Sequence, residues 1–221
     1  MTTQHVFYIP TVFLLGFVFG IIFSENKLLR SNNNSDGSSP DRMSKNKLLY
    51  TFLIFILVFI ITHLFEIPWG SKQVSSLLNG QEIFDKKPLF SSDEVYTKIG
   101  TFSEEGLKVY QRFTYTVDIV FPVSFFVFLL TFAQFVAYRI KKSKLINRII
   151  TGLPTLWLIT DLLENLIIYI ILSNYPTRYD FLGRIIGVVS VTKFTLLFYS
   201  IITPVIFWVM SKRSTSNLHI N

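Results

Sequence analysis

Three polar side chains interrupt an apolar stretch that is long enough to cross a bilayer. The stretch covers residues 149–172 and carries Asp161, Glu164 and Asn165 near its middle. At about 1.5 Å of rise per residue, a helix of this length covers roughly the 30 Å of hydrocarbon in a membrane. A charged side chain at that depth costs on the order of 3 kcal/mol on insertion scales. Because the spacing places all three side chains on one helix face, we expect that face to line the interior of a helical bundle.

Few other ionisable residues lie in or at the edge of an apolar stretch. Lys193 lies deep in the last stretch, with Ser190 and Ser200 on the same helix face. Three more lie near the ends of two earlier stretches, namely His63, Glu66 and Asp118. Since intramembrane charges mark functional sites by default, the set predicts a polar cavity that opens toward the outer side of the membrane.

These ionisable residues could form either of two kinds of site. In the first, Asp161 and Glu164 form a charge centre, with Lys193 as counter-ion or anion contact, and bind a small polar or ionic ligand or pass a proton. Asn165 would then supply a hydrogen bond, and Asp118 would stand at the entrance.

The second chemistry is a metal site. His63-x-x-Glu66 resembles the His/carboxylate pairs that hold bridged metals between facing helices. Its other ligands would be Asp118, Asp161 and Glu164. This interpretation is the weaker one, because a single histidine within the spans is few ligands for zinc and Lys193 would repel the ion. His5, near the first apolar stretch, could add one ligand.

Three functions remain open at this point. The leading hypothesis is a binding or transport protein, and the alternative is a membrane-embedded enzyme, with or without a metal, that acts on a lipid or isoprenoid. In a third interpretation, Asp161, Glu164 and Lys193 form a buried ion pair or triad that only fixes helix packing or pairs with a partner protein. Nothing in the sequence specifies a cofactor or a protein partner.

The composition fixes the class of protein. Half of the 221 residues are hydrophobic and 23 are Phe, which is too apolar for an ordinary soluble domain and predicts an all-α, polytopic membrane protein. The net charge of +7 is gathered in short segments between apolar stretches, a distribution that fits membrane topology and not a nucleic-acid-binding face. The absence of cysteine excludes disulfides and thiolate sites.

The chain divides into about five predicted spans. Residues 1–23 form a retained first span and 24–47 a flexible basic linker. Residues 48–210 form a four-helix core, which includes an outer segment at 70–113, and 211–221 form a tail. Within the core, the spans cover about 48–68, 115–138, 149–172 and 185–210.

The outer segment 70–113 is predicted to hold short helices. Capping-box sequences at 91–94 and 101–104 predict two helix starts. Apolar residues are sparse in this segment, so we expect no independent core and helices that lie on the membrane face.

The distribution of Lys and Arg between the spans predicts the orientation of the chain in the membrane. The segments 24–47, 139–148 and the tail hold 12 Lys and Arg residues against three acids, whereas 70–113 and 173–184 hold 8 against seven. The positive-inside rule therefore places the amino terminus outside and the carboxyl terminus in the cytoplasm of a cell or cytoplasmic membrane. The lipid bilayer is the expected partner, and the basic inner loops could also contact anionic lipid.

The chain carries a series of motifs, which are Gly100-x5-Gly106-x3-Tyr110-x-x-Phe113, Asp118-x-x-Phe121-Pro122, Pro154-x6-Asp161-x-x-Glu164-Asn165, Tyr175-Pro176 and Thr192-Lys193. This series resembles a group of small multi-pass membrane proteins without an established activity. The resemblance covers about residues 96–198, and its most specific part is the D-x-x-E-N helix followed by the T-K helix. It implies that Asp118, Asp161, Glu164, Asn165 and Lys193 belong to one site.

Overall fold

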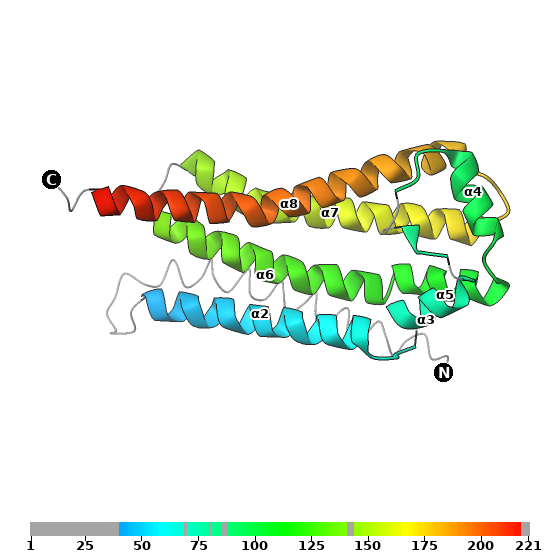
Figure 1. The fold of residues 1–221 in the computed structure, drawn as a ribbon, viewed down its shortest axis with the longest axis horizontal. Coiled ribbons are helices and arrows are strands. Elements are labelled where there is room, and N and C mark those ends of the chain that lie inside the picture. Colours follow the sequence, from blue (N-terminus) through cyan, green and yellow to red (C-terminus); the bar gives the residue numbers. More distant parts are fainter. Residues whose placement is uncertain (1–39, 69, 80, 85–87, 141–143, 218–221) are drawn as a thin grey trace.

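The computed structural model describes residues 40–217, apart from 69, 80, 85–87 and 141–143, and these residues form helices and no strand. The predicted first span at 1–23 and most of the predicted linker lie outside the described residues. The helices are α2 (Pro40–Leu64), α3 (Ser71–Leu77), α4 (Ser92–Gly100), α5 (Glu104–Thr114), α6 (Val117–Ile140), α7 (Lys144–Asn174) and α8 (Asp180–Asn217) (Figure 1). The prediction of an all-α protein is confirmed for this part of the chain.

Four helices in the described part are long and apolar enough to span a membrane. They cover Lys45–Leu64, Glu104–Tyr138, Lys144–Asn174 and Asp180–Met210, and the second of these joins α5 to α6. Helix α2 begins at Pro40, inside the predicted linker. Proline is favoured at the first helical position because its fixed φ suits a helix and its missing N–H has no helical acceptor there.

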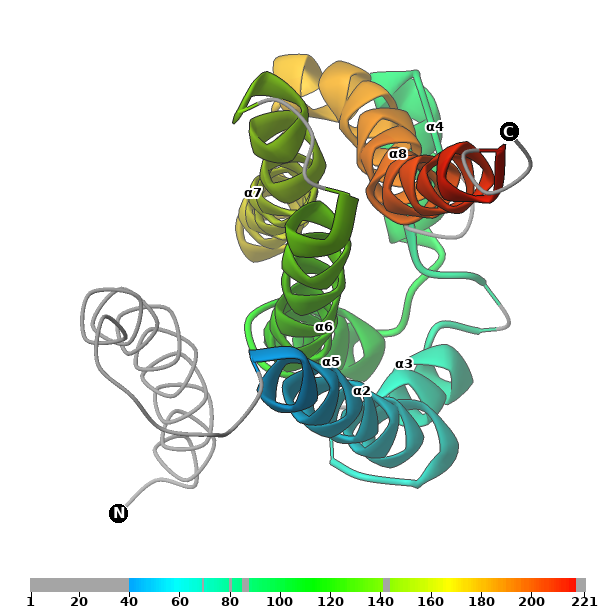
Figure 2. The same cartoon turned by 90° about the vertical axis from the view of Figure 1, so that its left-hand side faces the viewer.

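The long helices do not share one common interior. Helix α7 packs along α8 and against α6, and α6 also packs against α8. Helix α2 packs along α6 on the side away from α7 (Figure 2). Helices α6, α7 and α8 therefore form a group of three, and α2 packs on one side of α6.

Rows of aromatic rings join α2 to α6. Phe55 stacks on Phe125 with ring centroids 4.4 Å apart and on Phe128 at 5.7 Å. Phe125 also meets the edge of the Trp157 ring at 5.3 Å. These contacts give the phenylalanines of α6 a packing role between α2 and α7.

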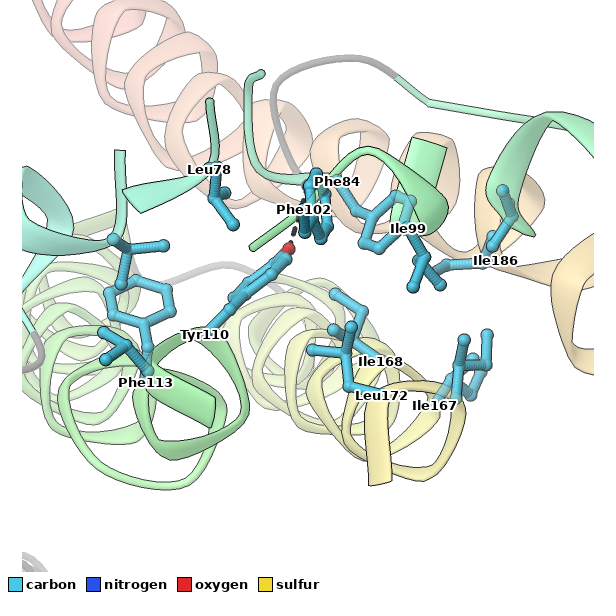
Figure 3. Packing of buried hydrophobic residues seen from close by; sticks show 14 of the residues in the cluster. Leu78, Phe84, Ile99, Phe102, Tyr110, Phe113, Ile167, Ile168, Leu172 and Ile186 are labelled. Carbon is cyan, nitrogen blue, oxygen red and sulfur yellow. Dashed lines mark hydrogen bonds between the residues drawn. The ribbon is translucent and has the colours of Figure 1, made fainter. Parts of the chain in front are cut away.

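The segment between α2 and α6 contributes to a buried core that it shares with the long helices. Its buried residues include Val74, Phe84, Ile99 and Tyr110, which pack with residues near the adjacent ends of α7 and α8, among them Ile168 and Ile186 (Figure 3). The Tyr110 hydroxyl accepts a 2.9 Å hydrogen bond from the backbone N–H of Phe84. The apolar residues suffice because the segment shares its core with the long helices instead of building one alone.

The helix starts in this segment agree in part with the predicted capping boxes. Helix α4 begins directly after Ser91, as predicted. Helix α5 begins after Ser103, whose Oγ accepts a 2.9 Å hydrogen bond from the N–H of Gly106. The predicted cap, Thr101, instead follows the end of α4, where its hydroxyl donates to the Lys98 carbonyl at 2.7 Å.

Candidate functional site

Helices α7 and α8 form an antiparallel hairpin that brings polar residues to the same depth. A short turn at 175–179 joins them, so residues at equal sequence distances from the turn lie opposite each other. Asp161 and Lys193 are each 13 residues from the helix ends at this turn, and Glu164 and Ser190 are each 10 residues away. With about 1.5 Å of rise per residue, the first pair lies roughly 20 Å into the hairpin.

Lys193 pairs with both acids of α7. Its Nζ lies 3.4 Å from Oδ1 of Asp161 and forms a closer ion pair with Oε2 of Glu164. The Ser190 hydroxyl donates to Oε1 of Glu164, and its oxygen also lies 3.0 Å from the carbonyl of Ile186. We call Asp161, Glu164 and Lys193 the charged triad.

The charged triad is buried. The side chains of Lys193, Asp161 and Glu164 are 5%, 8% and 0% exposed. The structure therefore differs from the expected cavity that opens outward, because the facing surfaces of α7 and α8 close around these groups. Ammonium and carboxylate groups are stable in such surroundings only when they are paired.

The triad occupies the centre of a regular packing seam. Buried positions recur along α7 in steps of four and three residues, at Ile150, Pro154, Trp157, Asp161, Glu164, Ile168 and Ile171, and Asn165, Ile167 and Leu172 are buried as well. Buried residues of α8 have a similar spacing, at Gly183, Ile186, Ser190, Lys193, Ser200 and Pro204, while Gly187 is buried as well and Leu197 is half-buried. This spacing is typical of helices that pack knobs into holes, and here polar groups fill the layers that apolar residues normally occupy.

Asn165 links this seam to α6. Its carboxamide donates a 2.8 Å hydrogen bond to the backbone carbonyl of Asp118. In an α-helix, that carbonyl would accept from the N–H four residues later, but residue 122 is proline and has none. Asn165 therefore supplies the donor that Pro122 lacks, and it brings Asp118, at the first turn of α6, beside the seam.

No protein-family model, curated protein or solved structure matches the chain. The site is therefore defined by its geometry alone.

His63 and Glu66 lie away from the charged triad. The His63 ring stacks on Phe59 and meets the edge of Phe121, both at centroid distances of 4.7 Å. Its Nδ1 lies 2.8 Å from the hydroxyl oxygen of Thr62, and Glu66 is exposed beyond the end of α2. These two residues belong to the α2–α6 side of the molecule, because α2 packs mainly on α6.

The predicted metal site is not assembled in the described residues. Within them, no group of three His, Asp or Glu side chains is arranged to hold a metal ion. The geometric reason is that His63 is on α2 and Glu66 lies just beyond its end, whereas Asp161 and Glu164 face Lys193 on α8. His5 lies outside the described residues.

Two glycines of α8 were not singled out from the sequence. A Cβ on Gly183 would lie 2.9 Å from the Cα of Ser92, and one on Gly187 would lie 2.3 Å from the carbonyl oxygen of Leu89. Residues 89–92, which lead into α4, therefore pack directly on the backbone of α8, one turn and two turns before Ser190. The sequence signal was the Gly-x-x-x-Gly spacing, which permits close approach to a helix.

Polar and charged side chains also hold the first turns of α4 against the α7–α8 turn. Arg178 pairs with Asp93 and lies 3.3 Å from Asp180, which accepts a 2.5 Å hydrogen bond from the hydroxyl of Ser92. The hydrogen bond from Arg178 to Asp93 raises the pKa of the guanidinium, so it stays charged. Tyr96 completes the contact, since its hydroxyl accepts from the N–H of Tyr179 at 2.6 Å.

Proposed function

We propose that the chain is an integral membrane protein of five spans whose charged triad binds or transports a small ionic ligand or protons. The single observation that carries the proposal is the burial of Asp161, Glu164 and Lys193 in the middle of two helices that are long and apolar enough to cross a membrane. Ionisable residues at that depth are costly, and they are commonly part of ion or proton pathways.

The proposed topology has the amino terminus outside and the carboxyl terminus in the cytoplasm of a cell membrane. It is supported by the excess of Lys and Arg in the segments 24–47, 139–148 and the tail. Helices α3, α4 and α5 and the α7–α8 turn lie together at one end of the molecule, and the carboxyl end of α8 lies at the other (Figure 1). In this orientation the short helices are extramembrane and outer, and the basic loops can contact anionic lipid.

The composition of the triad supports ion handling. Two acids face one lysine, and Lys193 is the only Lys or Arg deep in a span. If all three were ionised, the triad would hold one more negative than positive charge. A proton or a cation that binds there would balance it, and the stabilisation would be large in apolar surroundings. Asn165 and Asp118 would take part as neighbours of the triad.

A transport assay tests the proposal. Full-length protein is reconstituted into liposomes, a potassium diffusion potential is imposed, and the internal pH is followed with a dye in potassium, sodium and choline buffers. Wild type and the exposed control Glu82→Gln should carry flux above that of empty liposomes, whereas Asp161→Asn should reduce it at least tenfold. Flux that is equal in Asp161→Asn and wild type, or that never exceeds the empty-liposome rate, contradicts the proposal.

A structural role for the triad is the second candidate, and the packing seam favours it. A polar layer in a row of packed residues can fix the register of two helices, as single buried polar residues do in coiled coils. This role predicts wild-type protein without flux and variants of Glu164 and Lys193 that lose stability. Because these variants should lose stability in either role, the flux of the wild-type protein in the same reconstitution separates the two candidates.

A further inference from the structure

One turn of α8 presents two polar groups to a single carboxylate of α7. Ser190 and Lys193 are three residues apart, so their side chains lie on the same face of α8. The Ser190 hydroxyl donates to Oε1 of Glu164, and the Lys193 ammonium pairs with Oε2 of the same carboxylate. Contacts at both oxygens fix the rotation of the carboxylate as well as its position.

The hydroxyl of Ser190 differs from other hydroxyls of α8. In helices, Ser and Thr commonly donate to the carbonyl four residues earlier. Three residues of α8 do so at 2.7 or 2.8 Å, namely Thr192, Thr195 and Ser200. The Ser190 oxygen lies further from the corresponding carbonyl, that of Ile186, at 3.0 Å. Because a hydroxyl has one hydrogen and a carboxylate is the stronger acceptor, Ser190 donates to Glu164.

The contact between Ser190 and Glu164 lies in a buried part of the packing seam. Both residues are buried, and so are Ile168 and Ile186, which occupy the next layer toward the α7–α8 turn. In such surroundings a hydrogen bond to a charged group is stronger than at the surface, since water competes less for the carboxylate oxygens. The orientation of Glu164 therefore depends on this hydroxyl.

We infer that Ser190 is a positioning residue of the charged triad, which orients Glu164 so that Lys193 lies close to it and 3.4 Å from Asp161. The inference deepens the proposed function and rests on it in taking the triad as a site for ions. Without the hydroxyl, the carboxylate of Glu164 can turn about its last side-chain torsion, and the paired ammonium moves with it. The arrangement of charges that an ion meets then changes.

Infrared spectroscopy of the full-length protein in a bilayer tests the hydrogen bond without transport. Carboxyl-13C glutamate separates the glutamate carboxylate bands from those of aspartate. Ser190→Ala should shift one glutamate band, because the carboxylate stretch depends on the hydrogen bonds to each oxygen. Ser200→Ala is the matched control, since this buried hydroxyl of α8 donates to the Leu196 carbonyl, and it should shift no glutamate band. Ser190→Thr keeps a hydroxyl and should resemble the wild type.

Flux in liposomes, measured with the pH dye under a potassium diffusion potential, tests the role of this orientation. The variants are compared at equal amounts of folded protein, so that a loss of stability alone does not lower the flux. Ser190→Ala should reduce flux by about tenfold, the order that loss of one hydrogen bond to a charged group supports. Ser190→Thr should restore most of the flux, and Ser200→Ala should match the wild type.

Two outcomes overturn the inference. An unchanged glutamate band in Ser190→Ala would show that Ser190 does not orient Glu164. Equal flux in Ser190→Ala and an active wild type would show that this orientation does not matter to the site. If Ser190→Thr does not fold, the comparison of Ser190→Ala with Ser200→Ala still decides both points. A shifted band in Ser190→Ala together with a wild type that carries no flux would contradict the proposed function while supporting the positioning of Glu164 by Ser190.

Discussion

The side-chain amide of Asn165 donates to the backbone carbonyl of Asp118, at 2.8 Å, where Pro122 leaves α6 without its own donor. A side chain on α7 thus supplies the hydrogen-bond donor that the backbone of α6 lacks at Pro122. In a membrane interior, where water is scarce, a carbonyl without a donor costs several kcal/mol. The contact also explains why a polar residue next to Glu164 belongs in the packing of α7 against α6.

This relationship predicts a double-mutant cycle. Asn165→Ala should reduce the free energy of unfolding by about 1–3 kcal/mol, because the Asp118 carbonyl loses its partner. In a Pro122→Ala background the loss should be smaller, since the N–H of residue 122 can then donate to that carbonyl. Unfolding by increasing SDS in mixed micelles measures all four proteins. Equal losses from Asn165→Ala in both backgrounds would mean that the two residues are not coupled.

A second cycle tests the ion pair between Glu164 and Lys193. Removal of either partner alone, by Glu164→Gln or Lys193→Met, should reduce the free energy of unfolding by about 3–5 kcal/mol, because it leaves a buried charge without its main counter-ion. The double variant should lose less than the sum of the two single losses. The same SDS titration applies, with the exposed Glu82→Gln as control. Additive losses would show that the two groups do not stabilise each other.

The close approach at Gly187 makes another prediction. Gly187→Ala should reduce the free energy of unfolding by about 1–3 kcal/mol, because the new Cβ would lie 2.3 Å from the carbonyl oxygen of Leu89 and would push the segment before α4 away. The matched control is Gly152→Ala in α7, where no atom lies within 4 Å of the new Cβ. There alanine should be neutral or stabilise the helix by up to about 1 kcal/mol.

Limited proteolysis locates the effect of Gly187→Ala. Cleavage within residues 79–91 should become faster in this variant and stay at the wild-type rate in Gly152→Ala. An unchanged cleavage pattern in Gly187→Ala, together with unchanged stability, would contradict the packing of this segment on α8.

The hydroxyl of Tyr110 makes a fourth prediction. Tyr110→Phe should reduce the free energy of unfolding by about 1–3 kcal/mol, because the buried N–H of Phe84 loses its acceptor. Tyr50→Phe on the exposed face of α2 is the control and should change little. Hydrogen exchange of the Phe84 amide, measured by mass spectrometry of the covering peptide, should rise only in Tyr110→Phe.

The sequence alone determined the class of fold and the polar positions of the hairpin. Apolar stretches of spanning length predict long helices wherever they occur, because helix length and hydropathy are local properties. The sequence also predicted a short connection between the last two spans, at 173–184, but the structure narrowed it to 175–179 and so showed that Asp161 and Lys193 lie at equal depth. The spacing of Asp161, Glu164 and Asn165 places them on one helix face, and Lys193 shares a face with Ser190 and Ser200, so both faces were predicted to point into a bundle.

Only the tertiary structure determined which of the polar side chains contact each other. The sequence placed His63, Glu66 and Asp118 near the ends of helices, but it could not tell that α2 lies on the far side of α6, where His63 packs between Phe59 and Phe121. The sequence did not show that Lys193 is closer to Glu164 than to Asp161, or that Asn165 supplies the hydrogen-bond donor that Pro122 lacks. The physical reason is that periodicity fixes the polar face of a helix, whereas its neighbours and its rotation depend on packing along the whole length of the helices.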